Sequence, residues 1–270
     1  MALSIGGNYG MLRSLNNLRS TRSKMDQTLE RISSGLKINS AADDAGGLAM
    51  GMKLSLEVTK TENLQSSVAN AKSFVEAQSS ALESASDIVS EMQTLKLTYD
   101  QAIEADPLAD VSAYEQEFDD LKAQLNSLAG EKFNGEALFS SDSKSVSTAD
   151  DGNGEINFGG INLESPGTLD GINDLGDLGT ELDDALNEIT GYVGEVGSNA
   201  SSLGIASSYL ETKATNLEAA RSRIMDADIV EESTNLSKYT MQYEAAVAAI
   251  AQANSTQQTV MELLLFPKDK

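Results

Sequence analysis

Hydrophobic residues near the start of the chain recur in alternating steps of three and four, the heptad spacing of a coiled-coil helix. The repeat begins at Met11, and Arg22 fills a polar gap in it. Gly35 stands near its end, where a glycine often stops a helix. The predicted seam comprises Met11, Leu15, Leu18, Met25, Leu29, Ile32 and Leu36.

A second repeat with the same spacing lies near the other end of the sequence. Polar members weaken it, but the alanines between its members allow close helix approach. We expect the two repeats to pair as a coiled coil; the alternative is that each is an amphipathic helix on a larger core. The second seam comprises Leu236, Thr240, Tyr243, Val247, Ile250, Asn254, Gln257, Met261 and Leu264.

The longest helical pattern lies between these repeats. Apolar positions in residues 52–99 follow the helical period without a glycine or proline, and one helix of this length would measure about 70 Å. Such a helix must pack along others, and residues 112–128 and 182–225 carry matching patterns. Ser40 and Asp43 fit a loose form of the capping box at the start of the long helix.

Residues 132–180 have a different pattern, rich in glycine and turn residues. Short alternating stretches at 156–158 and 161–163 predict one or two β-hairpins. The expected fold class is therefore mainly α: long antiparallel helices and a terminal coiled coil, with a small β-hairpin insert at about 132–180.

Composition excludes most catalytic chemistry. The 270 residues include no histidine and no cysteine, so disulfides, cysteine-ligated metals and histidine-dependent triads are ruled out. We expect no enzyme activity and no cofactor.

Carboxylates provide the remaining chemical alternatives. Asp151, Asn153 and Glu155 resemble the start of a calcium loop, but Ile156 replaces the glycine and Asn162 the final glutamate of that motif, which favours a hairpin turn. The acidic pairs 43–44, 119–120 and 183–184 could supply a catalytic dyad. Adjacent helical residues point to different sides, however, so capping or solvated roles are favoured.

The net charge of −23 argues against nucleic-acid or anionic-membrane partners. Its distribution is uneven. Residues 1–44 carry six basic and four acidic side chains, residues 221–270 carry five and seven, and residues 45–220 carry eight and 31. Neutral ends suit burial, and an acidic centre suits exposure to water.

Both ends resemble bacterial flagellins. Residues 31–49, which contain Asn-Ser-Ala-Ala-Asp-Asp-Ala, closely resemble the N-terminal flagellin signature. Residues 220–228 and 251–254 are similar to its C-terminal counterpart, and residues 132–135 to the motif before the flagellin hairpin. The motifs are long and stand in the family's order.

The resemblance implies a structural subunit that polymerises into the flagellar filament used for motility. Residues 1–44 and 225–270 would form an inner tube, and residues 45–224 an outer tube without large outer domains. The partners would be further copies, an export chaperone, the cap and hook-junction proteins. The chain would leave the cell through the flagellar type III channel and be extracellular. The nearest alternative is a hook–filament junction protein.

Further expectations follow from the same pattern. Apolar seams at the ends would be unsatisfied in a monomer, so we expect residues 1–44 and 225–270 to order only on polymerisation. The N-terminal residues lack the basic and apolar regions of a cleaved signal peptide. The sequence contains no run of 18 apolar residues, so it predicts no membrane-spanning helix.

Two segments depart from the family pattern. The sequence continues to Lys270, past the leucines at which flagellins commonly stop, and Pro267 would end the helix. Residues 88–98 correspond to a segment that an animal innate-immune receptor recognises in many flagellins. Two arginines and a glutamate of the family are replaced here, which predicts weaker recognition. The residues at these positions are Glu91, Gln93 and Thr94, while Leu95 matches the family.

Overall fold

The chain folds as two compact units. The computed structural model describes residues 9–149, 154–163, 175–178 and 180–265. One unit combines Met1–Leu56 with Leu217–Lys270, and the other is Glu57–Asn216. The described helices are α1 (Tyr9–Ser34), α2 (Ala45–Ala105), α3 (Ser112–Ala129), the short 3-10 helix η1 (Leu175–Asp177), α4 (Glu181–Met225) and α5 (Ile229–Leu265).

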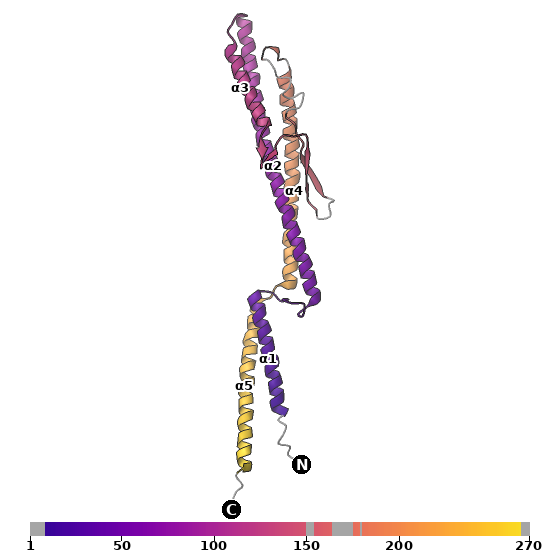
Figure 1. Ribbon diagram of the computed structural model, residues 1–270, viewed down its shortest axis with the longest axis vertical. Coiled ribbons are helices and arrows are strands. Elements are labelled where there is room, and N and C mark those ends of the chain that lie inside the picture. The colour runs from indigo at the N-terminus through magenta and orange to yellow at the C-terminus, as the bar shows by residue number, and fades with distance from the viewer. Residues whose placement is uncertain (1–8, 150–153, 164–174, 179, 266–270) are drawn as a thin grey trace, which may run out of the picture. The chain divides into compact units, whose positions relative to one another are not determined.

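In the first unit, α1 and α5 run antiparallel, side by side (Figure 1). The expected pairing of the two terminal repeats is therefore confirmed. The first turns of α2 and the last turns of α4 complete this unit. Residue 51 marks where α2 and α4 approach closely, because a Cβ atom added to Gly51 would lie 2.4 Å from the Met225 sulfur.

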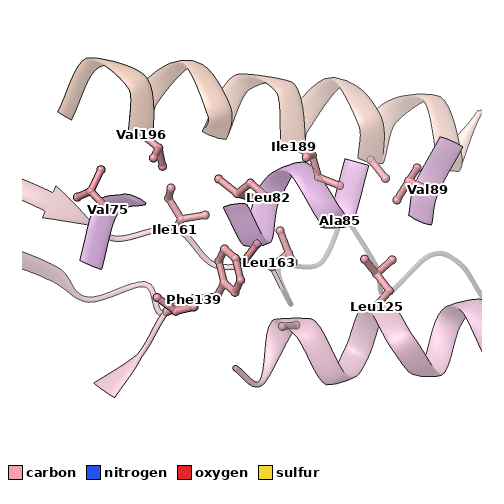
Figure 2. Packing of buried hydrophobic residues seen from close by; sticks show 14 of the residues in the cluster. Val75, Leu82, Ala85, Val89, Leu125, Phe139, Ile161, Leu163, Ile189 and Val196 are labelled. Carbon is pink, nitrogen blue, oxygen red and sulfur yellow. The ribbon is translucent and has the colours of Figure 1, made fainter. Parts of the chain in front are cut away.

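The second unit contains a continuous hydrophobic core formed by α2, α3, α4 and the segments after the strands. Leu82 and Val89 of α2 lie between Ile189 of α4 and Leu125 of α3 (Figure 2). All four side chains are fully buried or nearly so. These contacts explain why the long helices predicted from the periodicity form here, since most helical stability comes from packing an apolar face.

A two-residue hairpin follows α3. Strand β1 (Lys132–Phe133) pairs antiparallel with β2 (Glu136–Ala137). The turn between them is Asn134-Gly135, with φ angles of +52° and +87°. Both residues occupy the left-handed region that two-residue hairpins of the I′ type require, and Asn-Gly is the sequence that favours it.

A longer hairpin follows within the insert, where the sequence predicted one or two hairpins, but its strands differ from the predicted pair. Strand β3 (Ser143–Ser147) pairs antiparallel with β4 (Glu155–Gly159), with Ser143 opposite Gly159. Residues 150–153, where a turn or a calcium loop was expected, lie outside the described residues. The strand expected at 161–163 was wrong: these residues are not part of a strand, and Ile161 and Leu163 are instead fully buried in the core.

The start of α2 differs from the predicted one for a local reason. Asp44, not Ser40, caps α2, because its carboxylate accepts a hydrogen bond from the Gly47 N–H at 2.9 Å. The capping box expected at residues 40–43 is therefore wrong. Ser40 instead donates its N–H and its hydroxyl to Asp43 at 3.0 and 3.1 Å.

One buried polar contact ties the first hairpin region to α2. The Gln78 side chain is fully buried, and its amide donates a 2.8 Å hydrogen bond to the Leu138 carbonyl oxygen. The amide oxygen of Gln78 has no hydrogen-bond partner. A buried polar atom without a partner is unfavourable, so the hydrogen bond to Leu138 is the favourable polar contact of this side chain.

Candidate assembly surface

The contact between α1 and α5 follows heptad spacing on both helices. The repeat on α1 passes through Thr28, the buried residue of that helix, and the repeat on α5 through Glu232, also buried. Every other member is half-buried. The repeats are Met11, Ser14, Leu18, Thr21, Met25, Thr28 and Ile32 on α1, and Glu232, Leu236, Tyr239, Tyr243, Ala246, Ile250 and Ala253 on α5.

The seam residues predicted from the sequence fall into four groups. The members of the observed repeats are Met11, Leu18, Met25, Ile32, Leu236, Tyr243 and Ile250. Leu15, Leu36 and Thr240 are half-buried beside them, with the Thr240 hydroxyl 3.9 Å from the Met25 sulfur, and Asn254 is exposed. Leu29 and Val247 are exposed at 45% and 44%, because Thr28 and Ala246 take the adjacent positions in the contact. Met261 and Leu264 lie in α5, but their side chains are outside the described part.

An ion pair joins the two helices near the end of α1. The Arg31 guanidinium donates a 3.1 Å hydrogen bond from Nη1 to the Glu232 carboxylate. The Glu232 side chain is 11% exposed and that of Arg31 27%. Nε of Arg31 is buried without a hydrogen-bond partner. The pair is therefore largely removed from water, where the loss of one partner is more damaging than at the surface.

Backbone hydrogen bonds join the chain segment after α1 to the segment before α5. Gly35 has φ of +73°, the left-handed conformation that glycine adopts most easily after a helix. Its carbonyl accepts a 2.9 Å hydrogen bond from the Ala227 N–H, and the Lys37 N–H donates to the Met225 carbonyl at 2.6 Å. These backbone bonds fix the start of the α1–α5 pair.

Asp43 organises the turn that leads into α2. Its carboxylate accepts hydrogen bonds from Ser40, from the Asn39 N–H and from the Gln27 side chain. The Ser40 hydroxyl and then the Ser40 N–H are the main causes that lower the pKa of the Asp43 carboxyl. Asp43 thus has a structural role in the Asn-Ser-Ala-Ala-Asp-Asp block, and the acidic pair 43–44 serves a turn and a helix cap.

The unit that holds this helix pair has almost no hydrophobic core of its own. Among the described residues, Ile38 is its one buried hydrophobic side chain, and every other one lies between Val68 and Leu210. Large apolar residues on the same unit are exposed instead. They are Tyr9, Leu12, Leu29, Met50, Met52, Leu56, Ile229, Val230, Met241 and Val247.

The two units also differ in charge. The first unit has twelve basic and twelve acidic residues and is neutral. The second has seven basic and thirty acidic residues and carries the whole net charge of −23. An apolar, neutral surface of this kind is typical of protein–protein contact, and the acidic unit is suited to water.

The segment at residues 88–98 lies on α2 in the second unit. Glu91 and Thr94 are exposed, whereas Leu95 is 8% exposed and belongs to the core. Gln93 donates a 2.8 Å hydrogen bond to Asp183 at the start of α4. Two of the four residues can therefore meet a partner freely, and Gln93 already has a structural contact.

No group of three or more metal-ligating side chains occurs in the part of the chain that the structure describes. Asp119 and Asp120 are exposed on α3, and Asp183 and Asp184 lie in the first turn of α4. Over the same described ranges, no helix is both long and apolar enough to cross a membrane.

Comparisons with known proteins bear directly on this architecture. The bacterial flagellin N-terminal helical region matches residues 5–144, and the C-terminal helical region matches residues 180–264. The flagellin of Bacillus subtilis is 26% identical over 97% of this chain and 100% of its own length. The flagellar filament 33 kDa core protein of Treponema phagedenis is 26% identical over 96% and 99%. A crystal structure of Bacillus cereus flagellin aligns with 56% of this chain and 88% of its own, at 19% identity and a TM-score of 0.39.

The fold defines a mainly helical subunit whose two terminal helices pair and leave large apolar side chains exposed. The two matched regions together cover most of the sequence, so the chain belongs to the bacterial flagellin family. It is a structural subunit of the flagellar filament used for motility, and not an enzyme. Nothing in the comparisons favours the hook–filament junction protein that the sequence left open.

Proposed function

We propose that residues 1–44 and 225–270 form the inner tube of the filament, and that residues 45–224, with the insert at about 132–180, form the outer tube. The observation that carries this proposal is the division of core and charge. The helix pair α1–α5 is neutral and almost without a core, while residues 57–216 hold the core and the net charge. Like charges repeated along a narrow tube would repel.

The polymerisation seam proposed from the sequence has a specific role in this arrangement. Leu29 and Val247 lie beside the α1–α5 contact, not within it, and stay exposed in one subunit. Their apolar surface is thus available to neighbouring copies. Met25, Ile32 and Ile250, which belong to the observed α1–α5 repeats, would hold the two helices of one subunit together. Leu29 and Val247 would contact the helix pairs of neighbouring subunits.

Ordering of the helix pair should accompany polymerisation. A segment that buries one hydrophobic side chain gains too little to offset the entropy of fixing its backbone. Limited digestion with trypsin tests this. Arg13, Arg22 and Lys24 should be cut rapidly in the free subunit and protected in filaments, while Lys96, whose side chain is 17% exposed, should be protected in both. Protection of the first three sites in the free subunit would contradict the proposal.

Removal of residues 230–270 tests the inner tube directly. The shortened chain should remain a soluble, partly helical monomer, because the core between Val68 and Leu210 is intact. It should not polymerise at any concentration at which the native chain does. Electron microscopy and sedimentation report the outcome, and filaments from the shortened chain would refute the assignment.

Export and partners extend the proposal beyond the filament itself. We expect the chain to leave the cell through the flagellar type III channel without loss of a signal peptide, with an export chaperone, the filament cap and hook-junction proteins as partners. A strain without the export channel should retain the chain inside the cell. An exported chain lacking an N-terminal segment would argue for a cleaved signal instead.

Recognition by the innate-immune receptor should be weak. Glu91 places an anion where the family pattern has a cation, and Thr94 adds no charge. Leu95 matches the pattern, but it is buried in the subunit core. A cell reporter exposed to the purified monomer provides the test. A response as strong as that to a typical enteric flagellin would refute this expectation.

A further inference from the structure

Methionine is divided very unequally between the two units. Eight of the nine methionines lie in the first unit, although it is the smaller of the two. Leucine divides almost evenly, with fourteen in the first unit and seventeen in the second, and five of the six phenylalanines lie in the second. The unequal division is therefore a property of methionine that leucine does not share.

The methionines differ just as sharply in exposure. Met92, the methionine of the second unit, is fully buried in the core. In the first unit, Met50 and Met52 near the start of α2 are 51% and 64% exposed. Met241 of α5 is 64% exposed. A flexible thioether adapts its shape to an irregular neighbour, and methionine is for that reason common on surfaces that bind other proteins.

Met241 lies on a face of α5 that α1 does not cover. The residues one and two turns further along this face are Ala245, Ala248 and Ala249, and all three are exposed. The repeat that contacts α1, which includes Tyr243, follows a different face. A surface helix normally has one apolar face, so the second apolar face of α5 predicts a further partner. In the proposed inner tube, that partner is another copy of the chain.

Methionine carries all the sulfur of this chain, because the chain contains no cysteine. Hydrogen peroxide and other two-electron oxidants convert the thioether of methionine to a sulfoxide. The sulfur donates an electron pair to one peroxide oxygen, an S–O bond forms as the O–O bond breaks, and the second oxygen leaves as water. The side chain becomes polar. Burial of such a group without a hydrogen-bond partner is unfavourable, so oxidation weakens a surface that is covered on assembly.

We propose that Met50, Met52 and Met241 form an oxidation site that controls polymerisation, an inference that rests on the proposed role of the terminal helices in joining copies. Peroxide oxidises these three residues in the unassembled subunit, and the resulting sulfoxides oppose its addition to a filament. Neighbouring copies cover the same thioethers in the filament and protect them. Met92 stays reduced in both states, because the core of the second unit excludes the oxidant.

Partition of oxidised subunits between polymer and solution tests the proposal. The native chain is treated briefly with hydrogen peroxide, so that most oxidised chains carry a single sulfoxide, and the peroxide is then removed with catalase. After polymerisation, peptide mass spectrometry gives the sulfoxide fraction at each methionine in the pellet and in the supernatant. Sulfoxide at the three positions should be enriched about tenfold or more in the supernatant. Equal fractions in the two samples would overturn the proposal.

A pair of substitutions separates the loss of sulfur from the gain of polarity. Met241→Leu and Met241→Gln both remove the thioether, and only glutamine adds a polar group as the sulfoxide does. The critical concentration for polymerisation of Met241→Gln should therefore exceed that of Met241→Leu by about tenfold or more. Equal critical concentrations of the two variants would contradict the placement of Met241 on a covered surface.

Replacement of the three exposed methionines by leucine tests the oxidation step. The triple variant should retain a larger share of its own untreated polymer after peroxide than Met92→Leu, a control that removes one buried sulfur. Methionine sulfoxide reductases should restore polymerisation of the oxidised native chain. Equal retention by the triple variant and the control would refute the oxidation site. Filaments from the chain without residues 230–270 would count against the inner tube instead, so the two failures are distinguishable.

Discussion

The ion pair between Arg31 and Glu232 offers a quantitative test of how the helix pair forms. Glu232 and its neighbour Glu231 both stand in the first turn of α5, where either carboxylate interacts favourably with the helix dipole. Glu232 alone pairs with Arg31 and is buried, while Glu231 is exposed. Glu232→Gln and Glu231→Gln therefore remove the same charge from the same turn, and only the first removes the ion pair.

The structure sets the size of the expected difference. Two unit charges 3.1 Å apart attract by about 5 kcal/mol at an effective dielectric constant of 20, before the opposing desolvation is counted. Net values for a hydrogen bond to a charged group are about 1.5–3 kcal/mol. The dipole contribution, lost in both variants, is about 0.3–1 kcal/mol. Glu232→Gln should thus lose about 2 kcal/mol more than Glu231→Gln.

If the pair orders on polymerisation, this loss appears in the assembly equilibrium. A change of 2 kcal/mol is about thirtyfold in an equilibrium constant, so the critical concentration of Glu232→Gln should exceed that of Glu231→Gln by about that factor. Sedimentation of polymer at a series of subunit concentrations measures it. Equal critical concentrations for the two variants, with a lower melting temperature of the free Glu232→Gln subunit, would mean that the pair is already formed before assembly and would refute the reasoning.

Four further outcomes are expected. Leu29→Asp should abolish sedimentable filaments, because burying an unpaired charge costs several kcal/mol, without changing the circular dichroism of the free subunit. Gln78→Glu replaces the hydrogen-bond donor to Leu138 with a buried acid whose pKa is raised in the folded state. Its urea midpoint should therefore lie below that of the native chain. The difference should be smallest below about pH 4, where the acid is protonated in both states, and should grow as pH rises. Burial, and then the hydrogen bond to Glu188, raise the pKa of Tyr192 to about 12. The stability that protonated Tyr192 contributes should be complete below pH 10 and lost as pH rises through about 12. The difference in phenolate absorbance between the native chain and Tyr192→Phe should show a midpoint at that pH. Added salt should lower the critical concentration, because screening over about 10 Å at 0.1 M reduces repulsion between the acidic units.

Helix positions could be predicted from periodicity, but one helix start could not. The sequence predicted a long helix from residue 52, after the last of three glycines, since glycine within a helix is unfavourable by about 1 kcal/mol. α2 begins at Ala45 instead. Two of these glycines leave no room for a larger residue: a Cβ at Gly47 would lie 2.6 Å from the Ile38 side chain, and one at Gly51 would lie 2.4 Å from the Met225 sulfur. Close packing here outweighs helix propensity.

The terminal pairing could be predicted, but not its detailed contact. On both helices the apolar stripe is wide enough for two neighbouring heptad repeats that share every second member. The structure selects the repeat with Thr28 and Ala246, and leaves Leu29 and Val247 exposed. The sequence alone does not show which of the two repeats forms the α1–α5 contact, because that depends on which partner packs against each side of the helix. In the proposed inner tube, both sides of the helix would have partners.

The insert shows the opposite kind of error. Alternation at residues 161–163 predicted a strand, yet Ile161 and Leu163 alternate because both enter the core, without any strand partner among the described residues. The Asn134-Gly135 turn was available from the sequence as a hairpin signal. It was interpreted instead as part of a family motif, and the hairpin it forms was not predicted separately.

The division of core and charge between the two units explains how one chain can stay separate and then assemble. A subunit needs a stable folded part that does not aggregate, and residues 57–216 combine the core with thirty acidic groups. Under the proposed inner-tube arrangement, the rest of the chain orders only when copies surround it, which agrees with its lack of a core and its balance of twelve basic against twelve acidic residues. If the excess charge lay on the terminal pair, every added copy would bring that charge into the crowded tube. If the core lay there, the free subunits would present a folded, apolar surface and associate without control. Because the core and the excess charge both lie on residues 57–216, the chain avoids both outcomes. Assembly then depends on contacts that exist only between copies.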